Sequence, residues 1–223
     1  METVDYAPGR AADLFGSPED PTVLLWHGMQ TDSKAALTPL AESIAAHRLA
    51  VVVPNWNSHA ADGGRADLLA SAAFARDNAV DAGDLVAVGW SMGGLAAAGL
   101  TINPDVAGMR FARTICLAGA FTATDPISGG RLVDLLGAAP TGAFTLLHGL
   151  HDDVVPIGVS AAFANQLGEH GWPAEVVELD ADHGSIAGAA YDAAGDRYVP
   201  SDDPRTVEIA RAVAERIAVA AGR

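Results

Sequence analysis

The sequence predicts an α/β fold in which a mostly parallel central sheet carries helices on both faces. Short apolar runs rich in β-branched residues recur along the chain, and helix-like, alanine-rich segments separate them. Strands and helices that alternate in this way form parallel sheets with a helix layer on each side. The chain has 223 residues and no Pro, Gly or Ser-rich linker, so we expect a single domain over residues 1–223.

Six segments are predicted to be the strands of this sheet. Each is a short apolar run of the kind found in strands that are covered on both faces. They are Thr22–Trp26, Leu49–Val53, Asp84–Val88, Arg113–Leu117, Ala143–Leu147 and Ala174–Leu179. The opening segments VDYAP and AADLF are expected to add one or two antiparallel strands at an edge.

Helices are predicted between these strands. Thr38 is expected to cap a helix that has Pro39 at its first position, because Thr caps helices and Pro suits their first turn. Asp203 is expected to cap the last helix in the same way, ahead of Pro204. The other predicted helices are Gly64–Val80, Met92–Leu100 and Ile157–Glu169.

The charge of the chain excludes two classes of partner. Asp and Glu outnumber Lys and Arg by 28 to 13, for a formal net charge of -15, and Lys34 is the only lysine. Such a field repels phosphate groups, so we expect neither nucleic acid nor an anionic membrane as a partner. The acidic start METVDYAPGRAADLF lacks the basic patch and apolar core of a secretory signal, which predicts a cytoplasmic protein.

A metal site is not expected. Cys116 is the only cysteine, so no intramolecular disulfide or multi-thiolate site can form, and we interpret it as an inert core thiol. His148, His151, Asp152 and Asp153 are of ligand type. However, His148 ends a strand and should point away from the turn that follows, and no second ligand cluster is evident.

The segment Asp84–Gly94, DLVAVGWSMGG, carries the most specific chemical signal. A buried strand runs into Ser91, and an alanine-rich helix follows, so Ser91 is predicted to lie on a strand-to-helix turn. Gly89 and Gly93 allow the sharp turn and close approach that push the serine hydroxyl out above the sheet. This G-x-S-x-G pattern predicts a nucleophile elbow. The elbow lacks the lysine of a phosphate-binding P-loop.

A serine nucleophile needs a base, and the base needs a group that holds its tautomer. Functional loops of a parallel sheet gather at the carboxyl ends of its strands. Asp152 follows the strand Ala143–Leu147, and His183 follows the last strand, Ala174–Leu179. Ser91, Asp152 and His183 are therefore the predicted catalytic residues. Spacing alone leaves Asp153 as an alternative acid, while Asp182 is interpreted as a loop carboxylate.

The remaining histidines are expected to have other roles. His27 and His148 end strands and should form hydrogen bonds with loop backbone. His59 lies in the loop 55–63 and could reach the mouth of a pocket. His47 and His170 fall near helix ends, where partly exposed imidazoles are common.

From about Thr22 onward the chain resembles the α/β-hydrolase superfamily, and within it the small serine esterases of the carboxylesterase and dienelactone-hydrolase type. The segments GWSMGG, TLLHGLHDDVVP and ADHG resemble the nucleophile, acid and base segments, and VLLWHGM resembles the oxyanion loop. In the family pattern H-G-x-x-D-x-x-V-P the aspartate aligns with Asp152, which favours Asp152 over Asp153. The resemblance implies a compact, largely lidless enzyme without a metal or organic cofactor.

Two backbone amides are predicted to form the oxyanion hole, those of Met92 and Met29. Trp26, Trp56 and the two methionines could supply apolar pocket walls, whereas Trp90 is expected to pack in the core behind the elbow.

We therefore expect a hydrolase of small-molecule carboxylic esters with short to medium acyl chains, because the segment 120–142 is too short for a large lid. The segment 187–202 could fold over the pocket instead. A thioesterase or acyltransferase would use the same residues, a small amidase is a weaker alternative, and a noncatalytic binding protein should have lost one of the three roles. A homodimer is kept as a candidate assembly, although no exposed apolar stripe requires one.

Overall fold

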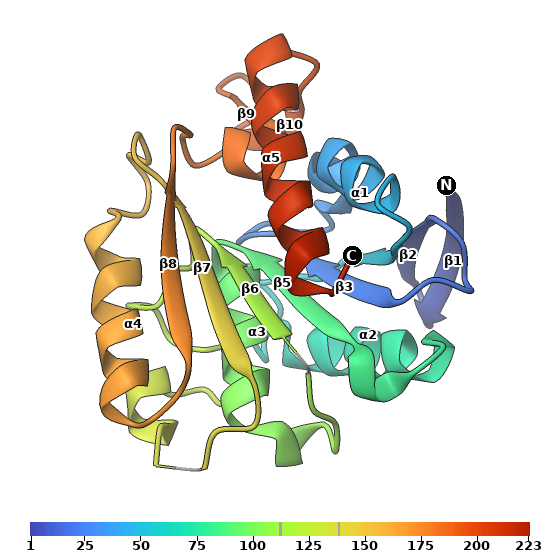
Figure 1. Cartoon of the computed structure of the whole chain (residues 1–223). Coiled ribbons are helices and arrows are strands. Elements are labelled where there is room, and N and C mark those ends of the chain that lie inside the picture. Colours follow the sequence, from blue (N-terminus) through green and yellow to red (C-terminus); the bar gives the residue numbers. More distant parts are fainter. Residues whose placement is uncertain (112, 138) are drawn as a thin grey trace.

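The computed structural model describes residues 1–111, 113–137 and 139–223. Its central sheet contains β1 (Glu2–Ala7), β2 (Arg10–Phe15), β3 (Thr22–Trp26), β4 (Ala50–Pro54), β5 (Val86–Trp90), β6 (Arg113–Leu117), β7 (Ala143–Gly149) and β8 (Ala174–Leu179). The spatial order is β1-β2-β4-β3-β5-β6-β7-β8 (Figure 1). Every neighbouring pair from β4 across to β8 is parallel, whereas β1 and β2 are antiparallel, as the sequence predicts.

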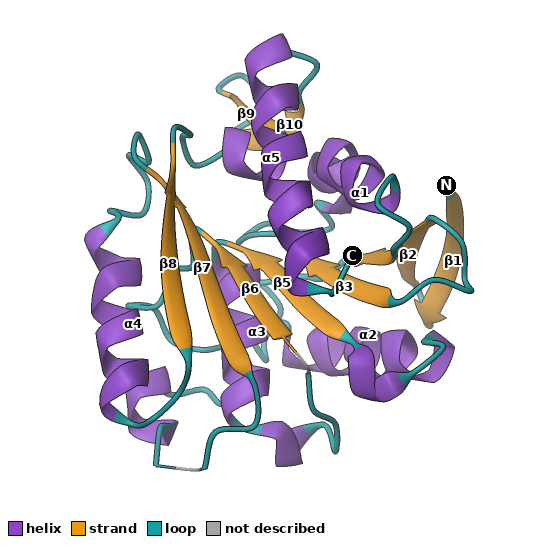
Figure 2. Ribbon diagram, viewed as in Figure 1, coloured by secondary structure: helices purple, strands orange, loops and turns teal. Residues whose placement is uncertain are grey.

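Helices cover both faces of this sheet (Figure 2). They are α1 (Thr38–Ala45), α2 (Arg65–Asn78), α3 (Met92–Ile102), α4 (Gly158–Glu169) and α5 (Pro204–Ala220). Helices α1 and α5 pack on one face, and α2, α3 and α4 pack on the other. None of the helices within the described ranges has the length and apolar character of a membrane span.

The two faces of β3 show how the core is divided. Side chains alternate across a strand, so neighbours in sequence point into different layers. Val23 and Leu25 belong to the cluster that contains α1 and α5, while Leu24 and Trp26 belong to the cluster that contains α2. All four are fully buried, which is why the run is apolar throughout rather than alternating. The end of β3 is thereby held rigidly, directly before the loop at residue 28.

Three of the six predicted strands have the bounds expected from the sequence, and the other three differ. Strand β4 begins and ends one residue later than predicted, and β7 continues to Gly149. The structure places β5 at Val86–Trp90 rather than Asp84–Val88. A short 3-10 helix over Ala82–Asp84 delays the strand, because the Asp81 carboxylate accepts a hydrogen bond from the Gly83 N–H at 2.7 Å. Pairing with β6 then continues to Trp90, opposite Leu117. The strand consequently delivers Trp90 directly to the turn that follows.

One of the two predicted helix caps is wrong. Thr38 does not cap α1 but is its first residue, because a 3-10 helix over Lys34–Leu37 runs straight into α1. Asp203 does cap α5, since its carboxylate accepts the Thr206 N–H at 3.0 Å. The segment 187–202 forms a separate hairpin of β9 (Ala189–Asp192) and β10 (Arg197–Pro200).

Candidate active site

Ser91 occupies a strained turn between β5 and α3. Its φ of 55° and ψ of -116° lie where side-chain-bearing residues are uncommon. The two glycines of the motif make this turn sterically feasible. A Cβ on Gly89 would lie 2.1 Å from the Gly93 carbonyl oxygen, and one on Gly93 would lie 2.4 Å from the His27 carbonyl oxygen. The G-x-S-x-G spacing therefore reflects backbone segments that touch, and Ser91 is left partly exposed above the sheet.

His183 and Asp152 form a hydrogen-bonded pair. The Nδ1–H of His183 donates to Oδ2 of Asp152 at 2.8 Å, and both side chains are almost fully buried. The other carboxylate oxygen accepts the backbone N–H groups of Val154 at 2.9 Å and Val155 at 2.8 Å. Burial alone would raise the pKa of Asp152, but the hydrogen bonds from His183 and these amides outweigh it and lower the pKa. Asp153, the alternative acid, is exposed.

This pair determines what the imidazole can do. An ionised carboxylate only accepts hydrogen bonds, so the proton of His183 is on Nδ1 and Nε2 carries the lone pair. Ser91 and His183 line the same cavity. The cavity therefore brings together an alcohol and an imidazole whose free nitrogen can take a proton.

Two aromatic side chains enclose His183. The indole N–H of Trp90 donates to the backbone carbonyl of His183 at 2.8 Å, and the two rings lie 5.3 Å apart. Tyr198 of β10 packs edge-on against Trp90 at 4.8 Å and lies 5.9 Å from the His183 ring. Burial and nearby carboxylates, Asp152 first among them, raise the pKa of Tyr198 to about 12. Trp90 is buried as predicted, but its contact with His183 could not be foreseen from its place in the strand.

The cavity has a volume of about 730 Å³, within the range typical of small-molecule sites. The β9–β10 hairpin borders it with Tyr191 and Tyr198, so the segment 187–202 does extend to the pocket. Met29, Val154 and Tyr191 are more than half exposed and give its mouth an apolar rim. His59 also lines this cavity, as its loop position predicts.

The two predicted oxyanion amides belong to segments next to Ser91, one along the chain and one in space. Met92 is the first residue of α3, where helix N–H groups lack intrahelical partners. Gly28, directly before Met29, is so near that a Cβ on it would lie 3.2 Å from the Ser91 Cβ. The Met29 N–H forms no hydrogen bond within the described parts of the chain. Both amides therefore remain candidates for the oxyanion hole.

The predicted pocket walls are partly wrong. Met29 does line the cavity, but Trp26 and Trp56 are fully buried and belong to the core under α2. Met92 packs half-buried against the cores beneath α2 and α4. The walls come instead from the segment 28–36 and from the hairpin, and Trp90, which was expected only to pack in the core, also lines the cavity. The turn-forming segment DAAGD between two aromatic residues, Tyr191 and Tyr198, is the signal that could have revealed the hairpin.

The two strand-end histidines are structural, as predicted. Nε2 of His27 accepts the N–H groups of Ser33 and Trp56, each at 3.2 Å, and its Nδ1–H donates to the Gly28 carbonyl at 2.8 Å. Desolvation lowers the pKa of His27 to about 4.

His148 accepts from the Ser160 hydroxyl at 2.7 Å and donates to the Val155 carbonyl at 2.8 Å. His148 therefore points toward the segment that follows its strand, and the expectation that it points away is wrong; its Nε2 also lies 3.5 Å from Oδ2 of Asp152. Asp182 accepts the amides of Gly184 and Ser185 and is a loop carboxylate, as expected. Cys116 is buried, and burial raises the pKa of its thiol.

Comparison with known proteins gives structural but not sequence matches. No protein-family model and no curated protein matches the chain. A Thermogutta terrifontis esterase bound to propionate superimposes with a TM-score of 0.74 at 17% identity, covering 98% of this chain and 93% of that one. The same organism's esterase 2 in a second structure, phosphorylated by paraoxon, gives 0.71 at 17% identity, with coverages of 97% and 94%. The S-formylglutathione hydrolase of Staphylococcus aureus gives 0.68 at 16% identity, with coverages of 99% and 95%. With its mostly parallel eight-stranded sheet, the chain has the α/β-hydrolase fold.

Proposed function

We propose that this protein is a serine hydrolase that cleaves small carboxylic esters through an acyl-enzyme. One observation carries the proposal: the strained serine of the elbow opens into the same cavity as an imidazole whose other nitrogen is held by a buried carboxylate. The presence of an esterase among the structural neighbours agrees with it. In this proposal Ser91 is the nucleophile, His183 the base and Asp152 the residue that orients the base.

In the acylation step, Nε2 of His183 takes the proton of the Ser91 hydroxyl as Oγ adds to the ester carbonyl. The carbonyl π electrons move to oxygen, and the resulting oxyanion accepts hydrogen bonds from the Met29 and Met92 amides. The imidazolium is stabilised by the Asp152 carboxylate. It then gives its proton to the departing alkoxide, which leaves as an alcohol, and the acyl group stays on Ser91.

In the deacylation step, water replaces the alcohol. His183 takes a proton from water as the hydroxide oxygen adds to the acyl carbon, and the same amides hold the second oxyanion. The Ser91–acyl bond breaks, and the proton returns from His183 to the serine oxygen. The products are a carboxylic acid and the free enzyme, so no cofactor enters the balance of atoms.

Short to medium acyl chains fit the cavity best. Loops and the β9–β10 hairpin, whose two strands have four residues each, border its mouth. These described segments take the place that an inserted helical lid would occupy. Within residues 118–137 and 139–142 of the connection after β6, the regular structure is a short 3-10 helix over Leu132–Leu135. Long-chain lipids usually require a larger apolar cover than the rim of Met29, Val154 and Tyr191.

The decisive test compares wild-type protein with Ser91→Ala on a series of aryl esters from acetate to decanoate. Removal of the nucleophile should lower kcat on the order of 10⁴-fold or more while leaving the unfolding transition in place. A fluorophosphonate should add to wild-type protein at Ser91, as located by mass spectrometry, and should not label the variant. Wild-type turnover by Ser91→Ala would refute the proposal, and an unlabelled, inactive wild type would point to a noncatalytic binding protein.

A thioester substrate is the second candidate, because one structural neighbour is an S-formylglutathione hydrolase. The same three residues would act, with a thiolate leaving in place of an alkoxide. Matched oxygen and sulfur esters of one acyl group separate the two substrate classes. A kcat/KM at least tenfold higher for the thioester would assign the protein to the thioesterases.

Single-domain organisation, a cytoplasmic location and a homodimer stay predictions. Limited proteolysis, cell fractionation and light scattering test them in turn. None of the catalytic steps above depends on their outcome.

A further inference from the structure

The loop after β3, residues 28–33, is joined to the rest of the fold by side-chain contacts. It carries the Met29 amide, yet it has no regular secondary structure beyond one isolated bridge between Thr31 and Asn57. Asp32 within it has a φ of 54°, a conformation that costs a side-chain-bearing residue free energy and persists only where neighbours enforce it. The orientation of the loop therefore depends on side-chain contacts.

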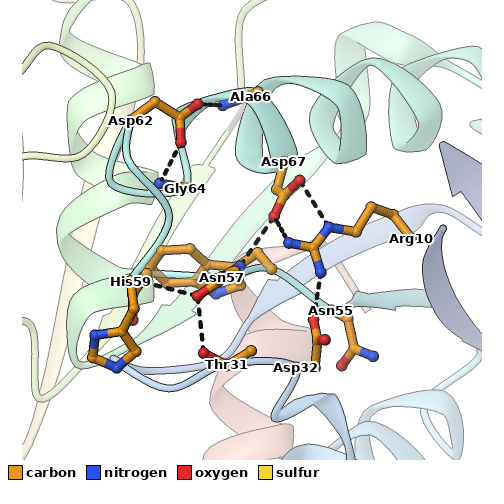
Figure 3. A network of polar contacts seen from close by, with 12 residues as sticks. Arg10, Thr31, Asp32, Asn55, Asn57, His59, Asp62, Gly64, Ala66 and Asp67 are labelled. Carbon is orange, nitrogen blue, oxygen red and sulfur yellow. Dashed lines mark hydrogen bonds and ion pairs between the residues drawn. The ribbon is translucent and has the colours of Figure 1, made fainter. Parts of the chain in front are cut away.

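One of these contacts comes from β2, which is separated from β3 in the sheet by β4 alone. Arg10 of β2 donates from Nη1 to Oδ1 of Asp32 at 2.7 Å (Figure 3). The same guanidinium donates from Nε to Oδ1 of Asp67 at 2.9 Å, and its Nη2 donates to the other oxygen of Asp67. A planar guanidinium can serve two carboxylates at fixed angles, which a lysine cannot do. Only 21% of the Arg10 side chain is exposed, so solvent screens the pairs incompletely.

Asp67 extends this attachment to a second loop. It accepts the backbone N–H of Asn57 at 3.1 Å, and the Asn57 side chain in turn accepts from the Thr31 hydroxyl at 2.8 Å. The Asp32 N–H donates to the Trp56 carbonyl at 3.1 Å. Arg10 thus lies at the centre of a network that contacts the 28–33 loop from two sides (Figure 3).

We propose that Arg10 is a positioning residue for catalysis, which through Asp32 and Asp67 holds the 28–33 loop so that the Met29 amide faces the oxyanion formed at Ser91. This inference rests on the proposed function. Two physical effects support it. A hydrogen-bond donor stabilises an oxyanion only when its placement is accurate to a fraction of an ångström. In addition, Asp32 lines the cavity, and without Arg10 its negative charge would act on the oxyanion uncompensated.

The test measures kcat and KM of Arg10→Ala, Asp32→Ala and the double variant on an aryl acetate. It also measures the Ki of a trifluoromethyl ketone. Ser91 adds to this ketone and creates an oxyanion without a leaving group, so the Ki reports the oxyanion hole directly. We expect Arg10→Ala to lower kcat about tenfold or more with KM within about twofold, and to weaken the ketone by the same factor as kcat/KM.

The double variant tests whether Arg10 acts through Asp32. We expect it to retain at least the kcat of Arg10→Ala, because removal of Asp32 also removes the uncompensated charge. If the fold-losses in kcat of the two single variants multiply in the double variant, the two residues act independently and the proposal is wrong. Arg10→Lys, which keeps the charge but cannot hold both carboxylates, should fall between wild type and Arg10→Ala.

Asp203→Ala is the matched stability control. It removes the cap of α5, which shares no residue with the Arg10 network, and should lower the unfolding midpoint with kcat unchanged. If Arg10→Ala changes kcat and the ketone Ki no more than Asp203→Ala does, the network is merely structural and the proposal is wrong. A wild-type protein that neither cleaves the ester nor binds the ketone would refute the proposed function instead. If Arg10→Ala does not fold, Asp32→Ala serves as the test. It leaves the Arg10–Asp67 pair in place and should therefore fold, but it removes the bond from Arg10 to the 28–33 loop and must still raise the Ki of the ketone.

Discussion

Two buried histidines at the site have the same kind of support but different surroundings at their ring nitrogens. His27 lies 5.3 Å from the ring of Trp56, whose indole N–H donates to the His27 carbonyl at 3.1 Å. His183 lies 5.3 Å from Trp90, whose indole N–H donates to the His183 carbonyl at 2.8 Å. In each case a tryptophan packs on the imidazole and holds the backbone of the same residue.

The ring nitrogens distinguish the two. His27 has both nitrogens bonded to backbone groups, and its exposure is 0%. His183 has one nitrogen on Asp152, and the other is available in the cavity with Ser91, although its exposure is only 3%. Burial alone therefore does not separate a structural imidazole from a candidate base. The hydrogen-bond partners of the two ring nitrogens do separate a structural imidazole from a candidate base.

The largest expected effect comes from removing the candidate base. His183→Ala should lower kcat for ester hydrolysis on the order of 10⁵ to 10⁶-fold, because the Ser91 proton then has no acceptor. Steady-state kinetics with an aryl acetate measure this loss. A kcat within tenfold of wild type would make His183 as structural as His27.

The next effect tests the partner that makes His183 different. Asp152→Asn should lower kcat on the order of 10⁴-fold, since an amide in place of the carboxylate favours the wrong tautomer of His183. Its exposed neighbour offers a matched control. Asp153→Asn should leave kcat within about twofold of wild type. Equal losses in the two variants, measured on one ester, would contradict the assignment of the acid.

The comparison also shows what the sequence can and cannot predict. The order Ser91, Asp152, His183 follows from strand ends, because parallel strands bring their carboxyl ends to one edge. His27 also ends a strand, and its predicted hydrogen bonds with the loop backbone are present. Such reasoning places a residue on a loop and identifies its chemistry.

It does not predict which distant side chain will meet that loop. Trp90 contacts a residue 93 positions away, and nothing in the local pattern distinguishes it from a core tryptophan. Tyr198 reaches His183 only because a short hairpin folds back over the site. Arg10 and Asp32 pair because antiparallel β2 lies between β1 and β4 in the sheet, and the sequence alone does not give the register of that pairing.

A smaller effect separates the two histidines by pH. The pKa of His27 is lowered from 6.5 to about 4, so the unfolded chain binds a proton there that the folded protein does not. Stability is therefore lost as the pH falls from about 6.5 toward 4. Between pH 7 and pH 5 the free energy of unfolding should decrease by about 2 kcal/mol from this residue. Urea titrations at the two pH values measure the difference.

His27→Gln is the comparison that isolates this contribution. Glutamine keeps an acceptor for the Ser33 and Trp56 amides but has no titrating group, so the decrease between pH 7 and pH 5 should shrink. Asp152 does not interfere in this window. Its pKa is lowered from 3.8, so its contribution is present above that pH and is lost only below it. An unchanged pH dependence in His27→Gln would show that His27 is not the group that loses its proton on folding.

The smallest expected effect concerns the support that the two histidines share. Trp90→Phe and Trp56→Phe each remove an indole N–H and leave a buried carbonyl without its donor, at a cost of about 1 kcal/mol each in unfolding free energy. Only Trp90→Phe should also lower kcat, by about threefold to tenfold, because the carbonyl that loses its hydrogen-bond donor belongs to the candidate base, His183. Trp56→Phe should leave kcat within about twofold of wild type, because the carbonyl that loses its donor belongs to His27, which takes no part in the proposed reaction. Variants that are equally stable and equally active would mean that the shared support serves folding alone, and that the Asp152 bond by itself aligns the imidazole with Ser91.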